Sequence, residues 1–373
     1  MAPNPSPCVD VVDPSAYTPP YDHALCAALA RAGARVRLQT SRFPYGPVPS
    51  PDGYERRERF YRRGAGGPGS RRRYAAKLAQ HVPDMLAYRR AAAGADIVHF
   101  QWLTIQPLDI HLLPKGRPLV LTAHDVLPRE PRRGQIAAQR RLYEHVDAVV
   151  VHSEHGRRRL VAGLEIDAAK VHVIEHGSFE HLTRVPGARL LPAELAKSTK
   201  PVVLFFGLLR PYKGVDVLLE AWRALEPDAE LWIVGNPRMD VSELRRTAPA
   251  SVHWVSRFVL DEEIAAYFER ADLVVLPYRE IDQSGVLFTA LAFGAPLLLS
   301  DVGGFGEVAA QDAAALVAPG DAAALAAAID RLIGDPGERA RLARGARDAA
   351  AGRYSWDAIA SRHLELYAGL LGR

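Results

Sequence analysis

Two cationic side chains, Arg210 and Lys213, stand in a turn between the apolar run 202–206 and the amphipathic segment 215–225. The run predicts a buried strand and the segment predicts a helix. Cations at the carboxyl end of a strand, beside the free amides of a helix N-terminus, favour a diphosphate ligand. Gly207 ends the strand and gives the backbone room to turn. The alternative is a basic turn that only caps a helix.

A polar loop follows the strand expected over 273–276 and leads into a helix that begins near Ser284. Serine is a favoured N-cap residue, and Gly285 permits a close approach of the backbone to a ligand. We expect the amides of Ser284, Gly285 and Val286 to hold a phosphate at this helix start. An ordinary capped turn is the alternative interpretation of the block.

A glycine pair, Gly303 and Gly304, follows the strand expected over 297–300. Such a pair after a buried strand indicates another close approach of backbone to ligand. Glu307, a few residues later, has the chemistry to accept hydrogen bonds from hydroxyl groups. A plain turn is again the alternative.

The elements that must position these residues form two series of short apolar runs alternating with helix-like segments, which predicts buried parallel strands with helical crossovers. The first series of expected strands comprises 9–12, 35–38, 97–100, 119–122, 148–152 and 171–175, with a helix over 22–32. The second comprises 202–206, 230–234, 252–255, 273–276 and 297–300. Two such series predict an α/β protein with two Rossmann-like domains, whose ligands bind at the carboxyl ends of the strands.

The bulk properties agree with a two-domain globular chain. It has 373 residues, of which 48% are hydrophobic and 24% charged, and a net charge of +4. That charge is too weak to indicate a nucleic-acid partner. The two cysteines, Cys8 and Cys26, have no metal-ligand spacing and favour a reducing compartment. Residues 1–10 do not resemble a signal peptide and no apolar run is long enough to span a bilayer, so we expect a cytoplasmic protein.

The segment 54–90 is unusually basic, with eleven Arg and Lys residues against three acidic ones. Its glycine-rich stretch, 64–70, predicts a mobile loop. The segment is either an ordinary solvated surface or a patch that attracts an anionic acceptor or an anionic membrane, which would give peripheral contact with the inner face of the cell membrane.

At the three glycine-containing blocks the chain resembles glycosyltransferase family 4, a large group of retaining enzymes with the GT-B fold. The resemblance rests on the order of short motifs from residue 201 to the end. These are Lys213-Gly214, Val234-Gly235, Ala271-Asp272 with Leu276-Pro277, Ser284-Gly285, Gly294-Ala295-Pro296, Asp301-Val302-Gly303-Gly304 and Tyr354-Ser355-Trp356.

The N-terminal half matches the family more loosely. The strand 120–123 ends in His124, which resembles a family histidine that faces the donor sugar; a structural histidine is the alternative. The resemblance implies an N-terminal acceptor-side domain over 1–185, a linker over 186–200 and a nucleotide-sugar-binding domain over 201–352. It also implies a helix over 353–373 that packs back on the first domain, and a central cleft between the two domains.

The resemblance implies a role for each of these residues. Arg210, Lys213 and the amides of 284–286 would bind the donor diphosphate, and His124 would contact the transferred sugar. Family members transfer a sugar from a nucleotide-diphosphate sugar to a hydroxyl acceptor such as a polysaccharide precursor, a lipid-linked sugar or a small metabolite. Many need no metal, and no metal-ligand cluster is visible in this sequence. The residues expected around the donor sugar and ribose are Glu280, Asp282, Gln283, Thr289 and Glu307, and the phosphate-loop glycines are Gly207, Gly303 and Gly304.

The chain departs from the family pattern at the positions of its usual paired glutamates, where Ile281 and Thr289 stand. Glu280 and Asp282 flank the first position and could substitute for it. Leu208 stands where an arginine is usual, and 17–23 replaces the usual glycine pair of the first domain. Two further hypotheses therefore stay open. One is a weak or inactive member that binds a nucleotide sugar or a protein partner; the other is a different enzyme on this fold, such as an epimerase. A nicotinamide oxidoreductase is disfavoured, because no Gly-x-Gly-x-x-Gly follows the first strand.

Overall fold

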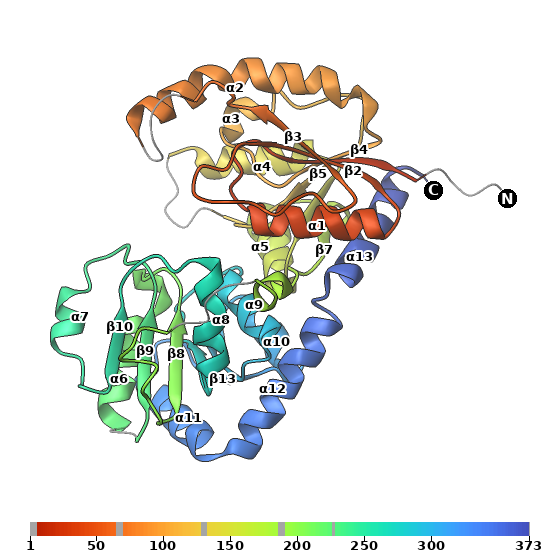
Figure 1. Ribbon diagram of the computed structural model, residues 1–373. Helices are drawn as coiled ribbons and strands as arrows, with labels where there is room; N and C mark the ends of the chain where they lie inside the picture. Colours follow the sequence, from red (N-terminus) through yellow and green to blue (C-terminus); the bar gives the residue numbers. More distant parts are fainter. Residues whose placement is uncertain (1–5, 65–69, 128–132, 186–190, 226–227, 373) are drawn as a thin grey trace. The chain divides into compact units, whose positions relative to one another are not determined.

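A computed structural model describes residues 6–64, 70–127, 133–185, 191–225 and 228–372. Most of the loop expected over 64–70 and the first part of the linker expected over 186–200 lie outside these ranges. The chain divides into two units (Figure 1). Unit 1 comprises Met1–Glu175 and Trp356–Arg373, and unit 2 comprises His176–Ser355.

Unit 1 is built on a seven-stranded parallel sheet with the order β3-β2-β1-β4-β5-β6-β7. Its strands are β1 (Cys8–Asp13), β2 (Arg35–Ser41), β3 (Glu55–Phe60), β4 (Ile97–Phe100), β5 (Leu119–Thr122), β6 (Ala148–Val151) and β7 (Val171–Val173). The central strands are buried along their whole length, which explains why they read as continuous apolar runs.

Helices cover both faces of this sheet, and the alternating strand side chains feed two separate cores. One core lies under α2, α4 and α5; the other lies under α1 and the C-terminal helix α13, which pack against each other. The helices of unit 1 are α1 (Pro19–Arg31), α2 (Arg71–Ala91), α3 (Gln106–Asp109), α4 (Gln135–His145), α5 (Glu154–Leu164) and α13 (Trp356–Leu370), with 3₁₀ turns η1 (Ala92–Gly94) and η2 (Ala168–Lys170).

The strand β3 was not expected from the sequence, because five of its six residues are charged. It lies at the edge of the sheet, where charged side chains remain exposed and discourage pairing with another chain. Its last residue, Phe60, is buried and anchors the strand in the core shared with α2. Edge position therefore explains a strand that lacks the apolar pattern on which the sequence prediction relied.

Unit 2 contains a six-stranded parallel sheet with the order β10-β9-β8-β11-β12-β13. Its strands are β8 (Val202–Phe206), β9 (Glu230–Val234), β10 (Val252–Val255), β11 (Leu273–Leu276), β12 (Leu297–Ser300) and β13 (Ala314–Val317). Its helices are α6 (Val215–Leu225), α7 (Ser242–Arg246), α8 (Asp261–Arg270), α9 (Gly285–Ala292), α10 (Phe305–Ala309), α11 (Ala322–Gly334) and α12 (Pro336–Ala351), with 3₁₀ turns η3 (Glu180–Thr183) and η4 (Pro211–Lys213). One continuous apolar core joins the sheet to its helices.

The two sheets share one winding pattern, in which the strand order reverses next to the first strand of each unit. The reversal falls between β1 and β4 in unit 1 and between β8 and β11 in unit 2. In open α/β sheets the ligand crevice lies at the carboxyl ends of the strands at such a switch point. Within the described ranges, no helix is both long enough and apolar enough to cross a bilayer.

Candidate functional site

The carboxyl edge of the unit 2 sheet is assembled by glycines whose backbones touch. Gly235, at φ +149°, follows β9, and a Cβ added to it would lie 1.8 Å from the carbonyl oxygen of Gly207. Gly214 and Gly303 are equally tight, against the carbonyl oxygens of Pro277 and Ile281 at 2.0 and 1.9 Å. Because each has a positive φ and no room for a side chain, these positions require glycine. The contacts bring together the three blocks that the sequence singled out.

Lys213 lies at the centre of this edge, and its side chain is buried in spite of its charge. Its Nζ sits over the ring of Tyr278, 4.8 Å from the ring centroid, in a cation–π contact. A Cβ added to Gly207 would lie 3.2 Å from this Nζ and 2.9 Å from Cγ2 of Val286. The turn after β8 therefore carries its cation to the first turn of α9.

The turn that carries Lys213 is clamped from outside by Arg279. This guanidinium donates to both carboxylate oxygens of Asp216, at 2.8 and 2.5 Å, and to the carbonyl oxygen of Pro211 at 2.9 Å. The pair with Arg279 lowers the pKa of Asp216. The amide of Arg279 also donates to the carbonyl oxygen of Tyr212. The loop after β11 and η4 are thus held as one body, although the ion pair itself is half exposed.

The helix α9 begins at Gly285, so the amides of Gly285 and Val286 are in its first turn and have no acceptor within the helix. Ser284 occupies the N-cap position as expected, but its hydroxyl makes no capping hydrogen bond. The hydroxyl instead lies 3.4 Å from that of Tyr278, the ring that supports Lys213. The amides of Gly285 and Val286 therefore lie near the ammonium of Lys213. This combination of helix amides and a cation suits an anion.

The remaining predicted residues of unit 2 are distributed more widely. Arg210 is exposed and its carbonyl begins η4, so its backbone is next to Lys213 while no contact fixes its guanidinium among the described residues. Thr289 donates its hydroxyl to the carbonyl oxygen of Gly285 at 3.0 Å. Glu280 is exposed, Asp282 is buried, and Gln283 and Glu307 are half-buried. Gly304 is the N-cap residue of α10.

In unit 1 the predicted residue His124 lies just beyond β5, enclosed by aromatic rings. Trp102 stacks on it with ring centroids 5.0 Å apart and planes 14° from parallel. Tyr21 meets it edge-on, with centroids 4.7 Å apart and planes at 90°. This packing fixes the plane of the imidazole, as the expected sugar contact requires.

Both ring nitrogens of His124 lie within hydrogen-bond distance of a partner. Nδ1 of His152 donates to the carbonyl oxygen of Ile174 at 2.9 Å, so Nε2 of neutral His152 is an acceptor, and it lies 3.2 Å from Nδ1 of His124. Burial lowers the pKa of His152 to about 4, which keeps it neutral. Nδ1 of His124 therefore donates, and its Nε2 lies 3.1 Å from the amide oxygen Oε1 of Gln101. In a neutral ring with Nδ1 protonated, Nε2 is an acceptor, so it suits a ligand group that donates a hydrogen bond, such as a hydroxyl.

A buried carboxyl pair, Asp13 and Asp22, organises the loop beside this histidine. Asp13 accepts hydrogen bonds from the amides of Ser15, Tyr17 and Thr18. Burial, and then the neighbouring charge of Asp13, raise the pKa of Asp22 well above its ordinary value. Thr18 in turn accepts from Nε1 of Trp102 at 2.8 Å. The segment 17–23 is thus an ordered substitute for the glycine pair usual in the family.

Several of these supporting residues were missed by the sequence prediction. Gln101 and Trp102 directly follow β4, so the rule that strand ends carry ligands could have found them. Arg279 and Asp216 are 63 residues apart, and no local signal connects them. Within the described part of the chain, no cluster of three or more His, Cys, Asp or Glu side chains could hold a metal ion.

Two family models match consecutive parts of the chain. The family model for Glycosyltransferase Family 4 matches residues 21–178, and the model for glycosyl transferases group 1 matches residues 200–335. The D-inositol 3-phosphate glycosyltransferase of Xylanimonas cellulosilytica is 27% identical over 308 residues, covering 75% of this chain and 73% of that protein. The GDP-mannose:glycolipid 4-beta-D-mannosyltransferase of Xanthomonas campestris is 32% identical over 191 residues, covering 49% of this chain and 50% of that protein.

Solved structures share the fold over nearly the whole chain. Sucrose-phosphate synthase from Thermosynechococcus elongatus superposes with a TM-score of 0.76 at 22% identity, covering 98% of this chain and 99% of that one. An Anabaena protein in complex with UDP gives a TM-score of 0.73 at 19% identity, covering 97% and 99%. With the two family models placed in tandem and two Rossmann-like units of GT-B type, the chain is a glycosyltransferase and belongs to glycosyltransferase family 4.

Proposed function

We propose that this enzyme transfers a sugar from a nucleotide-diphosphate sugar to a hydroxyl acceptor with retention of configuration. The observation that carries the proposal is the buried ammonium of Lys213 beside the first turn of α9. An ammonium held away from water next to helix amides concentrates positive potential at one point, which favours an anionic ligand there. A diphosphate supplies two phosphoryl groups for this ammonium and the helix amides.

The residues of unit 2 would act chiefly on the leaving group. As the bond between the anomeric carbon and the diphosphate oxygen breaks, negative charge grows on that oxygen. Lys213 and the amides of Gly285 and Val286 are already oriented, so they stabilise this charge without reorganising. In a front-face displacement the departing diphosphate takes the proton of the acceptor hydroxyl, which makes positioning the main requirement on the protein.

His124 would contact the transferred sugar from unit 1. Its Nδ1 donates to His152, and its Nε2, which lies 3.1 Å from Oε1 of Gln101, would accept a hydrogen bond from a sugar hydroxyl. The stacked Trp102 and the carboxyl pair behind it would keep the imidazole plane constant when the sugar binds.

The printed names of relatives guide the choice of donors. The Xanthomonas enzyme uses GDP-mannose, and the Anabaena protein was solved with UDP and with UDP-glucose. We therefore propose a UDP- or GDP-hexose as donor, with no metal required for its binding. The acceptor would be a hydroxyl-bearing sugar, a lipid-linked sugar or a small metabolite.

The test is turnover with a panel of UDP- and GDP-hexoses in the presence of EDTA, measured as released nucleoside diphosphate. Wild type is expected to release nucleotide from one donor of the panel, and Lys213→Ala to do so at least ~100-fold more slowly, since it removes a charge that stabilises the leaving group. The anomeric proton coupling of the product, read by NMR, reports retention or inversion. An inverted product, or equal rates for both proteins, would contradict the proposal.

A second candidate function is a weak or inactive member that binds a nucleotide sugar or a protein partner. It is favoured by one feature, the hydroxyl of Thr289 at a position that usually holds a glutamate and its bond to the carbonyl oxygen of Gly285. Nucleotide binding that depends on Lys213, with no release from any donor, would favour this candidate. Restoring a carboxylate with Thr289→Glu would then be expected to raise turnover.

A further inference from the structure

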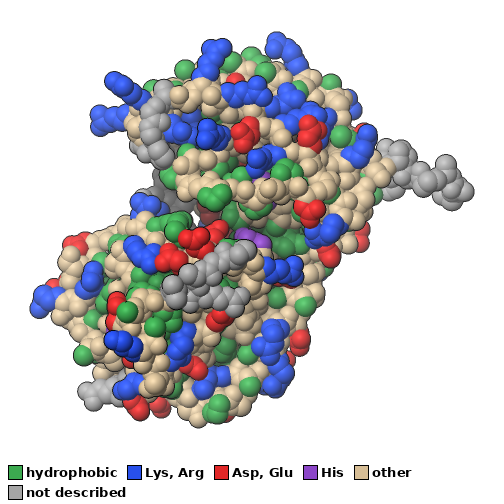
Figure 2. All heavy atoms as spheres, viewed as in Figure 1, with side chains coloured by type: hydrophobic (Ala, Val, Ile, Leu, Met, Phe, Trp, Pro, Cys, Tyr) green, Lys and Arg blue, Asp and Glu red, His purple; other side chains and the backbone are tan. Residues whose placement is uncertain are grey.

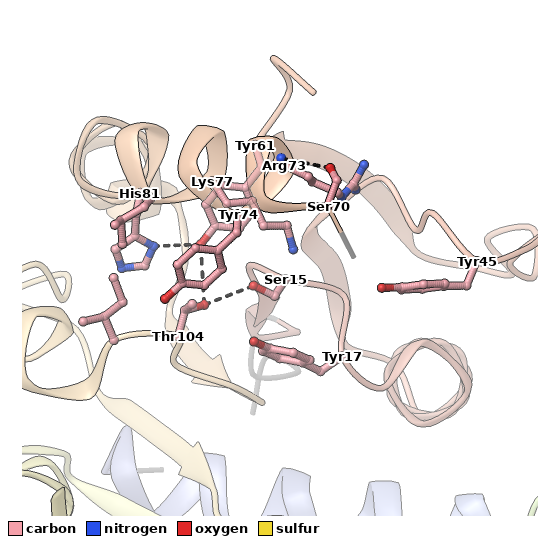
Figure 3. Close-up of a pocket in the computed structure, with 12 residues that line it drawn as sticks. Ser15, Tyr17, Tyr45, Tyr61, Ser70, Arg73, Tyr74, Lys77, His81 and Thr104 are labelled. Carbon is pink, nitrogen blue, oxygen red and sulfur yellow. Dashed lines mark hydrogen bonds between the residues drawn. The ribbon is translucent and has the colours of Figure 1, made fainter. Parts of the chain in front are cut away.

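A cavity of about 410 Å³ opens in unit 1 where β1 and β4 end (Figure 3). Ser15 and Tyr17 reach it from the loop after β1, and Thr104 reaches it from the loop after β4. This is the switch point of the seven-stranded sheet, the place where such folds bind ligands. The proposed diphosphate-binding residues belong to unit 2, and His124, the proposed contact of the transferred sugar, does not line this cavity. The cavity is therefore a second candidate for a ligand.

Four tyrosines form the walls of the cavity, and three of them are exposed. Tyr17, Tyr45 and Tyr74 retain 57%, 67% and 72% of their accessible surface, so their rings are available to a ligand in the cavity. In Figure 3 the hydroxyl of Tyr45 points toward the space below Lys77. Aromatic faces with adjacent hydroxyls suit the carbon faces and hydroxyls of a sugar or polyol.

Two cations from α2, Arg73 and Lys77, border the same space one helical turn apart. Neither forms an ion pair with a carboxylate of the described residues, whereas the edge-strand arginine Arg57 is paired with Glu55 at 2.5 Å. Nζ of Lys77 lies 5.1 Å from the ring centroid of Tyr61, and in Figure 3 it ends inside the cavity. Both side chains are half-buried, so their charges are less screened than those of fully exposed arginines.

The charged groups around Lys77 come from two directions. Burial, and then the nearby Arg73, lower the pKa of Lys77, while Asp13 opposes the shift. Asp13 accepts hydrogen bonds from three loop amides and offsets part of this positive charge. An anionic ligand beside the two cations Arg73 and Lys77 would therefore meet a net positive charge.

A chain of hydrogen bonds holds the polar floor of the cavity. Nε2 of His81 lies 2.5 Å from Oδ1 of Asp109, and Nδ1 of His81 lies 2.7 Å from the hydroxyl oxygen of Tyr61. Thr104 lies near this oxygen and 3.1 Å from the hydroxyl of Ser15. The floor thus offers fixed oxygen atoms to the hydroxyls of a ligand.

We propose that this cavity binds the acceptor and that the acceptor is a sugar or polyol that carries a phosphate group. The phosphate lies between Arg73 and Lys77, the ring lies against the tyrosines, and the hydroxyls meet the floor. Two cations match the charge of a phosphate dianion better than that of a carboxylate. The inference rests on the proposed function, since it names the acceptor class of the same transfer.

The test is calorimetric titration of the full chain with inorganic phosphate, glucose 6-phosphate, glucuronate and glucose. Glucose 6-phosphate is expected to bind at least ~10-fold more tightly than glucose or glucuronate, and phosphate to compete with it. Lys77→Gln and Arg73→Gln are each expected to weaken its binding about 10-fold or more, because each removes a charge-assisted contact. The matched control is Arg72→Gln, which removes the same charge from an exposed position of the same helix. Equal affinities for glucose and glucose 6-phosphate, or equal losses in all three variants, would overturn the proposal.

A second arm separates a soluble phosphate from a membrane surface. Figure 2 shows numerous Lys and Arg side chains on the visible face of the unit that contains α2 and β3. The experiment is co-sedimentation with phosphatidylglycerol vesicles. If Arg72→Gln and Lys77→Gln weaken vesicle binding equally, and glucose 6-phosphate does not reduce it, the basic segment is a membrane contact instead. We expect the wild type to bind glucose 6-phosphate in the absence of vesicles.

Binding of UDP to each variant keeps the two proposals distinguishable. We expect Lys77→Gln to bind UDP as the wild type does and to lose only the sugar phosphate. If UDP binding and donor turnover are intact but the phosphate group does not strengthen acceptor binding, the acceptor inference is wrong and the proposed function still stands. Loss of UDP binding in Lys213→Ala leaves the sugar-phosphate titration unaffected.

Discussion

The two units carry the same strand order, yet their carboxyl edges are built by different means. In unit 2, Gly214, Gly235 and Gly303 lie so close to neighbouring backbone carbonyl oxygens that no side chain fits. In unit 1, hydrogen-bonded side chains such as the half-buried His124 and the buried His152 define the edge. The edge of unit 2 is therefore shaped by glycines, which have no side chain, and the edge of unit 1 is shaped by hydrogen bonds between side chains.

This difference has a functional meaning under the proposed assignment. A diphosphate is the common part of every donor, and a backbone-lined edge recognises it through amides and one lysine. An acceptor varies between enzymes, and an edge built from side chains can change with single substitutions. The glycine edge would thus be the general half of the enzyme, and the side-chain edge the specific half.

The largest effect should come from breaking the glycine edge. Gly235→Ala places a Cβ 1.8 Å from a carbonyl oxygen, so the backbone must move, and we expect a loss of about 3 kcal/mol or more in the free energy of unfolding. The control is Gly320→Ala, at a glycine whose φ is also positive, at +78°, but with no atom within 4 Å of the new Cβ. It should cost about 1 kcal/mol. Urea unfolding measures both losses. Equal losses in the free energy of unfolding for the two variants would show that the close glycine contacts do not stabilise the edge.

Unit 1 should be sensitive to acid, because it contains buried histidines. Burial lowers the pKa values of His152 and His363 to about 4 from 6.5, so the unfolded chain takes up protons first as the pH falls. Stability should be fully present above pH 6.5 and decrease between pH 6.5 and 4, by about 3 kcal/mol for each histidine at the lower limit.

A single variant tests this acid sensitivity. His363→Phe removes one titrating group whose Nε2 has no partner among the described residues, and keeps an aromatic ring. Urea unfolding at pH 7 and pH 5 should show a smaller difference for the variant than for the wild type. An unchanged difference would show that the buried histidines do not control the stability of this unit.

A smaller and purely functional effect is expected at the clamp of unit 2. Arg279→Lys removes the bidentate contact with Asp216 but keeps the charge, so the turn that carries Lys213 loses a constraint. We expect about 10-fold weaker UDP binding with little change in stability, because the pair is half exposed. Asp216→Asn should have the same effect, and the double variant should be no worse than either single one. Additive losses in calorimetric titrations would show that the two residues do not act through one contact.

Most of the fold could be predicted because buried parallel strands have a strong local signature. Runs such as 202–206 and 273–276 became β8 and β11, and the amphipathic segment 215–225 became α6. The edge strand β3 could not be predicted, because its charged residues carry no apolar pattern. Ser284 was expected to cap its helix and does not, since its hydroxyl is next to Tyr278 instead.

The two candidate sites differ in predictability for the same reason. Lys213 and the glycines could be predicted from the sequence, because a tight turn after a strand requires glycine and this requirement shows in a few consecutive residues. The link from Asp109 through His81 to Tyr61 joins residues from three elements, and only the folded chain brings them together. The roles assigned to Arg210, Glu280 and Glu307 remain proposals.

The most direct test of the account is a pair of calorimetric titrations on three proteins: wild type, Lys213→Gln and Lys77→Gln. UDP should lose at least ~10-fold in affinity for Lys213→Gln alone, and glucose 6-phosphate should lose as much for Lys77→Gln alone. If either lysine variant weakens both ligands equally, or neither variant weakens its own, the division into a donor edge and an acceptor edge is wrong.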